Sequence, residues 1–212
     1  MPTPGIDLCF RRARMSPVPQ VEPQSAARFL REATAQAHAR VEALPHMPEL
    51  AAGTLDRARY AQVLACHLAV LAPWECTHAP WLDTLAAHGW PYRRRAAALR
   101  HDLAALGAGA PMAPQPAPPA DDPARAWGML YVVEGALLGG RIIARQLRLQ
   151  QPQLAPALAY LDMGSEDPSA WRRFQGCLEA ALADPAARAQ AAAGARAMFA
   201  RFAHHLCAGV RA

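Results

Sequence analysis

A histidine and a carboxylate one helical turn apart are the first residues in the sequence that could carry chemistry. His38 and Glu42 are four positions apart, so on a helix both side chains would lie on one face. An imidazole that binds iron through one ring nitrogen commonly donates a hydrogen bond from the other nitrogen, and Glu42 is placed to accept it directly or through water. A lone pair of this kind is also common as a surface hydrogen bond. The spacing alone therefore permits ligation by His38 and does not require it.

Glycines inside an apolar helical segment form the second feature. Gly135, Gly139 and Gly140 fall within a few residues of one another, and each interior glycine destabilises a helix by about 1 kcal/mol relative to alanine. The spacing of Gly135 and Gly139 suits close packing of two helices. Alternatively, the missing side chains let the backbone approach a planar group, and a kink could free amide groups for a small ligand. The adjacent glycines favour this second interpretation. With His38, they suggest a flat cofactor held between an imidazole and bare backbone.

Helices are the elements that must position these residues. The chain of 212 residues is long enough for one domain with a sizeable core, and its Ala-, Leu- and Arg-rich composition favours helices over strands. Ser25 is a good N-cap for a helix that reaches about Ala43. Asp122 followed by a proline begins a second helix, which carries the glycines and reaches about Leu149.

The remaining helices are predicted from caps, prolines and glycines. We expect a helix starting at Thr54, a kink or division at Pro73 and Pro80 before Gly89, a segment over 91–107, a helix over 169–183 and a last helix from Asp184 to near Cys207. Residues 1–24 read as a disordered, basic, proline-rich tail, and residues 107–123 as a proline-rich loop. The prediction is a single all-α domain of about seven helices over residues 25–212.

Composition and charge exclude several classes of function. The net charge is +5, but the arginines are scattered and form no long basic run, which argues against nucleic-acid binding. Five cysteines without a Cys-x-x-Cys pair indicate a reducing cytoplasm. The longest apolar run, from Met129 to Ile143, is interrupted by Glu134 and is too short for a membrane span, so we expect no membrane association.

Taken together, the two segments resemble the haem oxygenase family. Residues 30–42, Leu-Arg-Glu-Ala-Thr-x-x-x-His-x-x-x-Glu, resemble its proximal-helix signature. Residues 131–140, Tyr-Val-Val-Glu-Gly-x-x-Leu-Gly-Gly, resemble its distal-helix signature, as in bacterial members associated with phytochromes. Residues 163–174 are similar to a later helix of the family, and the resemblance extends over residues 25–207 in the right order. It implies the haem-oxygenase-like helical fold, with haem between the proximal and distal helices.

The resemblance implies a role for each residue on the proximal side. His38 would ligate the haem iron, and Glu42 would be the hydrogen-bonding partner of its ring. Arg31 would pair with a haem propionate, which a guanidinium suits well. Arg172 and Arg173 are further propionate candidates.

On the distal side, the resemblance places the glycines against the haem. Gly139 and Gly140 would lie over its distal face, with Gly135 beside them, and Gly139 could donate its amide to iron-bound dioxygen. Tyr131 would line the pocket. Ala136 departs from the family, because animal-type members have a water-anchoring aspartate there and similar bacterial members often have serine. The water network would then depend on backbone, on Arg141 or on another polar group.

The implied reaction is oxidative cleavage of haem to biliverdin, with release of CO and ferrous iron, using O2 and external electrons. Haem would be both substrate and cofactor. The sequence has no flavin or dinucleotide motif, so a ferredoxin-like or other donor must supply the electrons. A bacteriophytochrome that receives the biliverdin is a candidate partner.

Three other interpretations stay open at the level of sequence. The same fold could serve as a haem carrier or sensor without turnover, which Ala136 favours. The chain could instead be a helical interaction module that binds no haem, with His38 at its surface. A metal site made of Cys66, His67, Cys76 and His78 would require the chain to fold back at Pro73.

Overall fold

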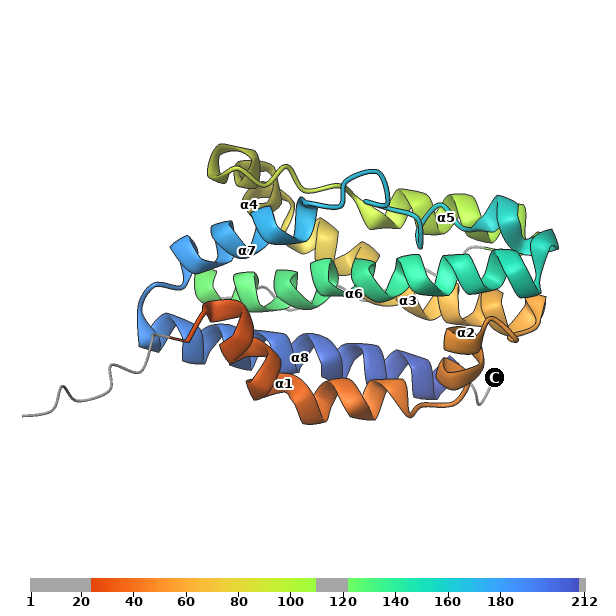
Figure 1. Cartoon of the computed structure of the whole chain (residues 1–212), viewed down its shortest axis with the longest axis horizontal. Coiled ribbons are helices and arrows are strands. Elements are labelled where there is room, and N and C mark those ends of the chain that lie inside the picture. Colours follow the sequence, from red (N-terminus) through yellow and green to blue (C-terminus); the bar gives the residue numbers. More distant parts are fainter. Residues whose placement is uncertain (1–23, 110–121, 210–212) are drawn as a thin grey trace, which may run out of the picture.

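The computed structural model describes residues 24–109 and 122–209. Every regular element in these residues is helical (Figure 1). The elements are α1 (Ala26–Glu42), α2 (Met47–Ala52), α3 (Arg57–Thr77), α4 (Ala79–Thr84), the 3-10 helix η1 (Leu85–His88), α5 (Arg95–Ala105), α6 (Pro123–Gln150), the 3-10 helix η2 (Pro152–Ala157), α7 (Ala170–Ala181) and α8 (Pro185–Gly209). The predicted all-α class is confirmed. The short α2 and η2 were not predicted, and they bring the helices above the expected number. The predicted tail and most of the predicted loop lie outside the described residues.

Local capping explains where the two helices of interest begin. The Ser25 hydroxyl accepts a hydrogen bond from the Arg28 amide at 3.3 Å, and the Asp122 carboxylate accepts one from the Ala124 amide at 2.7 Å. Each oxygen satisfies an amide that has no partner within its helix. The predicted starts of α1 and α6 are therefore confirmed.

Two predictions around α3 are wrong. The helix begins at Arg57, a few residues later than expected. Its cap is the carboxylate of Asp56, and not Thr54, which accepts a hydrogen bond from the Arg59 amide at 2.9 Å. Pro73 does not divide the helix, which continues to Thr77. The predicted division near Pro80 and the stop at Gly89 are confirmed, because α4 begins at Ala79 and Gly89 caps the end of η1. Pro73 and Trp74 are buried in the core. We attribute the continuity to this packing, which outweighs the one hydrogen bond that a proline removes.

The long helices α6 and α8 cross at very short range and form the centre of the fold (Figure 1). A Cβ atom added to Gly128 would lie 1.8 Å from the Ala191 carbonyl oxygen, and one added to Gly194 would lie 2.1 Å from the Arg125 carbonyl oxygen. Only glycine permits such an approach at these two positions. Helices α1 and α3 pack against the other faces of α8.

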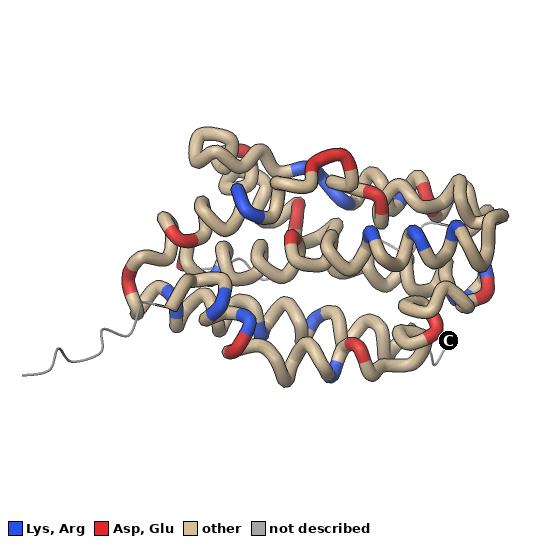
Figure 2. Tube along the Cα trace, viewed as in Figure 1, with Lys and Arg blue, Asp and Glu red and all other residues tan. Residues whose placement is uncertain are grey.

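Charge is distributed over the whole molecule and is not concentrated in one stripe. Figure 2 shows basic and acidic residues on most helices, as the scattered arginines of the sequence predict. Of the described helices, α6 is long and apolar enough to cross a membrane by length and composition, but half of its apolar window is buried inside the protein. Core helices of soluble proteins pass the same test, and Glu134 in the middle of α6 forms an internal ion pair with Arg95.

Candidate functional site

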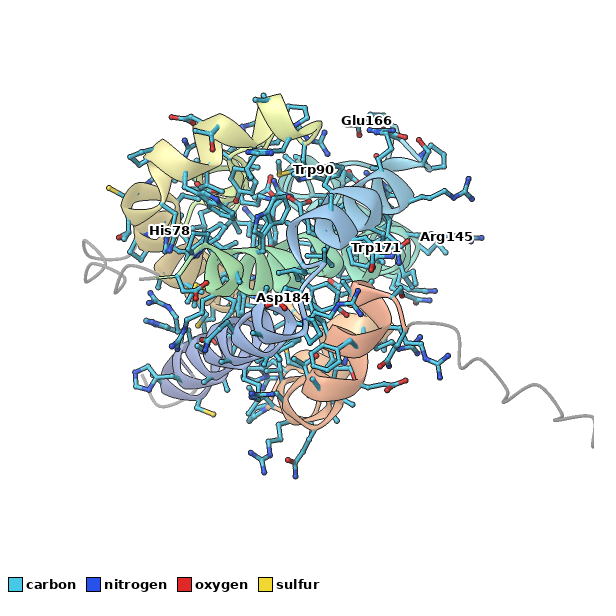
Figure 3. All side chains as sticks on the ribbon, turned by 90° about the vertical axis from the view of Figure 1, so that its left-hand side faces the viewer. His78, Trp90, Arg145, Glu166, Trp171 and Asp184 are labelled. Atoms are coloured by element: carbon cyan, nitrogen blue, oxygen red, sulfur yellow. The ribbon has the colours of Figure 1, made fainter. Side chains whose placement is uncertain are left out.

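The candidate site lies between helices α1 and α6, which carry the two sequence signatures. Both helices pack against α8 and α7, yet the described residues bring α1 and α6 into little direct contact with each other. Figure 3 looks along the bundle from the end at which α7 lies, with α1 and α7 on the same side of α6. The two signatures therefore lie on helices that are held by the same two neighbours, α7 and α8.

His38 is accessible on α1 and is held from two sides. Its side chain is 57% exposed, and its Nδ1 lies 3.3 Å from the Glu42 carboxylate. The imidazole also meets the ring of Phe199 on α8 edge to face, with 5.6 Å between centroids and an interplanar angle of 89°. Among the described residues Nε2 has no partner. The ring is thus oriented by Glu42 and Phe199 while its second nitrogen can bind a ligand.

Gly139 is the one glycine of α6 that has open space where its side chain would be. A Cβ atom added there would meet nothing within 4 Å. Leu138 and Ile142 beside it are 39% and 65% exposed, although both are large apolar side chains. Ala136 is also exposed. Exposed apolar side chains around a bare backbone indicate a binding surface for an apolar, flat ligand.

The glycines of α6 differ in what surrounds them. Gly140 is buried on another face, where an added Cβ would lie 3.1 Å from the Leu161 carbonyl oxygen. Gly140 therefore contributes to close packing against Leu161, and its place over a ligand stays a prediction. Gly128, which sequence reasoning missed, packs even more tightly against α8. Gly135 lies at the edge of the open region, 3.8 Å from the indole of Trp171 as measured from an added Cβ.

Arg31 of α1 and Tyr131 of α6 are close enough to interact electrostatically. Burial raises the pKa of the half-buried Tyr131 hydroxyl, and the positive charge of Arg31 partly opposes this rise. The guanidinium is exposed and makes no hydrogen bond to a described residue. A cation on one helix and a phenol on the other form a suitable pair of donors for a carboxylate.

Arg141 and Arg173 are engaged in holding the segment before α7. The Arg141 guanidinium donates to the carbonyl oxygens of Gly164 and, at 3.4 Å, Asp167. Arg173 forms an ion pair with the Asp167 carboxylate at 2.5 Å. The head group of Arg141 is thus engaged with this loop, and its role in a distal water network stays a prediction. Arg172 is exposed on α7.

A metal site of side chains alone is not formed in the described part of the chain. No three His, Cys, Asp or Glu side chains there come together as metal ligands. Because α3 is continuous through Pro73, the pair at Cys66 and His67 stays well separated along the helix from Cys76 and His78.

Comparison with known proteins gives one consistent result. Residues 24–207 match the family model described as Heme oxygenase. A haem oxygenase of Xanthomonas campestris pv. campestris is 52% identical over 166 residues, which cover 78% of this chain and 98% of that protein.

Solved structures match over most of the chain. The haem oxygenase of Leptospira interrogans superposes with a TM-score of 0.68 at 18% identity, over 87% of this chain and 100% of that one. The haem complex of Synechocystis haem oxygenase-1 gives 0.67 at 17% identity, over 86% and 91%. The NO- and CO-bound enzyme from Neisseria meningitidis gives 0.64 at 22% identity, over 87% and 92%. At these identities the superpositions establish a common fold.

Proposed function

The chain belongs to the haem oxygenase family, and we propose that haem binds in a cleft between α1 and α6, with His38 as the proximal iron ligand. The reaction is the oxidative cleavage of haem to biliverdin, with release of CO and ferrous iron, using O2 and external electrons. Haem is the substrate and supplies the redox-active iron and the porphyrin ring that is opened. The protein supplies binding, orientation and exclusion of water.

One observation carries the assignment of the site. An accessible imidazole on α1 and a position without a side chain on α6 belong to two walls that hardly touch each other, and exposed apolar side chains surround the bare position. His38 provides a nitrogen ligand for iron, and Gly139 lets backbone approach the face of a planar ring. Leu138 and Ile142 would lose their exposure to water when the ring binds.

Residues around His38 set its capacity as a ligand. Glu42 beside Nδ1 favours the tautomer that carries a proton on Nδ1 and leaves Nε2 for iron. Phe199 restricts rotation of the ring by its edge-to-face contact. Both effects favour one orientation of the imidazole plane relative to the porphyrin.

We assign Arg31 and Tyr131 to the haem propionates. The two donors come from opposite walls of the cleft, so a carboxylate bound by both would connect α1 to α6. Arg172 is exposed near the same end of the bundle and remains a candidate for a longer-range charge contact. Arg173 is already paired with Asp167, so it is a weaker one.

Electrons must reach the haem from a separate protein. A net charge of +5 suits an acidic donor of the ferredoxin type, because opposite charges accelerate encounter. We also propose that the enzyme acts in the cytoplasm and that its biliverdin serves a bacteriophytochrome. The reducing compartment follows from the cysteine usage, and the phytochrome partner from the resemblance of residues 131–140.

A haem carrier or sensor on the same fold is the second candidate function. Ala136 favours it, because this exposed residue of α6 has a methyl group and cannot anchor a water molecule for proton supply. In a carrier, haem would bind through His38 and would not be converted in the presence of reductant and O2.

Haem titration and a bilin assay test both candidates. The wild-type protein is expected to give a Soret band with axial histidine ligation, and His38→Ala should shift or abolish it. His204→Ala, which alters an exposed histidine of α8, is the matched control and should behave as wild type. Absence of a Soret band in the wild type would exclude haem binding. Stable haem without bilin formation, under O2 with ascorbate or ferredoxin, would establish the carrier.

A further inference from the structure

Trp171 of α7 stands at the edge of the open face of α6. Its Cη2 atom lies 3.8 Å from the Cβ position of Gly135, while Gly139, one helical turn further along α6, has nothing within 4 Å. One turn corresponds to about 5.4 Å along the helix axis. The face of α6 therefore changes from covered to open within a single turn, and the indole marks the boundary.

The indole is fixed in place by other aromatic rings. It lies 5.5 Å from Phe174, which is fully buried, and 5.9 Å from Tyr131, measured between ring centroids. Phe174 in turn contacts the rings of Trp90 and Trp127 in the core. A side chain supported by such a cluster cannot rotate away without disturbing the packing.

Helix α7 is also attached to the other wall of the cleft. The Ala26 amide at the start of α1 donates a hydrogen bond of 2.6 Å to the Glu179 carboxylate of α7. Trp171 is thus connected to α6 through Gly135 and Tyr131 and to α1 through the helix that bears it. Figure 3 shows Trp171 in the region where α7, α6 and α1 approach one another.

We infer that Trp171 is a specificity-determining residue, whose indole forms the end wall of the cleft and selects the in-plane rotation of haem and hence the meso carbon that is cleaved. This inference rests on the proposed function. The porphyrin over Gly139 would meet the edge of the indole on one side and the flexible side chain of Ile142 on the other. Because Arg31 and Tyr131 lie at the Trp171 end, the carboxylate-bearing edge of haem is expected there.

Trp171→Phe is the most informative variant. Phenylalanine retains an aromatic ring against Phe174 but lacks the Cη2 atom that reaches Gly135. We expect this variant to fold, to bind haem through His38 and to change the ratio of bilin isomers by about fivefold, as the loss of one aromatic contact implies. Trp171→Leu should shift the ratio further. Leu149→Ala is the control, since this exposed apolar side chain of α6 lies ten residues beyond Gly139 and belongs to none of these aromatic contacts.

Two readouts separate this role from a merely structural one. Chromatography of the bilins reports the carbon that is cleaved, and NMR of the ferric cyanide complex reports the rotation of haem through its methyl signals before any turnover. Unchanged isomer ratios and unchanged methyl signals in haem-loaded Trp171→Phe would overturn the inference. Failure of the wild type to bind haem would instead overturn the proposed function. Wild-type bilin formation with an unaltered product in the variant would overturn the inference alone.

Discussion

Glu134 and Arg95 form an ion pair in the interior of the protein, with 2.6 Å between the Glu134 Oε2 atom and a guanidinium nitrogen. Their side chains are 3% and 2% exposed. The Trp90 indole donates to the other carboxylate oxygen at 3.1 Å, and the Arg95 guanidinium lies 4.5 Å from the centre of the Tyr92 ring. Because Glu134 directly precedes Gly135, this pair fixes one face of α6 while the cleft lies along another.

Removing one member of this pair should destabilise the fold strongly. Glu134→Gln keeps the size of the side chain but removes the carboxylate that pairs directly with the buried Arg95 guanidinium, so that only the Glu75 carboxylate nearby still opposes this charge. The free energy of unfolding is expected to fall by up to roughly 3–5 kcal/mol. Urea denaturation followed by circular dichroism measures this change.

The exposed pair of Arg28 and Glu32 provides the control. Their side chains are separated by 3.0 Å and are mostly exposed to solvent. Glu32→Gln should leave the denaturation midpoint close to that of the wild type. Equal effects of Glu134→Gln and Glu32→Gln would contradict the importance of burial.

Gly139→Ala should separate the stability of α6 from its function. The added methyl group meets no neighbour, and alanine favours a helix over glycine by about 1 kcal/mol, so the haem-free protein should become more stable. The same methyl group would project toward the porphyrin and weaken haem binding. Thermal unfolding without haem and haem titration measure the two effects, and an unchanged haem affinity would place the ring elsewhere.

Gly128→Ala should lower the stability of the protein, whereas Gly139→Ala should raise it. Its methyl group would collide with the Ala191 carbonyl, and relief requires the backbones of α6 and α8 to separate. We expect the free energy of unfolding to fall by about 1–3 kcal/mol, as for other overpacked cores. The unfolding midpoint, measured as for Gly139→Ala, should therefore fall. A midpoint equal to that of the wild type would mean that the crossing is looser than described.

His67 should make stability depend on pH. Its ring lies against Tyr160 and Phe202, and burial lowers its pKa to about 4 from 6.5. The unfolded chain therefore takes up a proton at higher pH than the folded protein. The contribution of neutral His67 is present above pH 6.5 and is lost as the pH falls toward 4.

Thermal unfolding at a series of pH values tests this contribution. His67→Gln can still hydrogen-bond to the Tyr160 hydroxyl, which lies 3.1 Å from Nδ1 in the wild type, and it does not titrate. The difference in midpoint between wild type and variant should shrink between pH 6.5 and 4. A difference that stays constant over this range would refute the assignment to His67.

Arg141 is expected to order the loop before α7. Arg141→Leu removes the donors to the Gly164 and Asp167 carbonyl oxygens, so amide hydrogen exchange over 164–169 should accelerate. Arg145→Leu is a suitable control, because Figure 3 shows Arg145 pointing away from the body of the molecule. Unchanged protection in Arg141→Leu would argue that the ion pairs Arg173–Asp167 and Arg93–Glu166 hold the loop without Arg141.

Sequence reasoning succeeded where the cause is local. Ser25 and Asp122 act on amides within a few residues, so their caps are evident from residue type and order. Adjacent glycines point about 100° apart on a helix, and only the neighbouring segments decide which of them is covered. Sequence therefore could not distinguish Gly139, which is open, from Gly140, which packs on Leu161.

Contacts between distant segments could not be predicted from the sequence for the same reason. The Glu134–Arg95 pair joins α6 to α5, and Trp171 reaches Gly135 from α7. Each residue taken alone reads as an ordinary core or surface position. A charged residue in an apolar helix and a tryptophan near a later helix start were visible, but no spacing rule connects either to its partner.

The crossing at Gly128 has a geometric consequence for the distant cleft. Gly128 and Gly139 lie about 16 Å apart along the axis of α6. If α6 tilts about the point where it touches Ala191, Gly139 moves in proportion to this distance. A small change of the crossing angle then displaces the part of α6 around Gly139. Because α1 rests on the same helix α8, the aperture between the walls follows that angle. Substrate fit can therefore be tuned by residues that never touch the substrate.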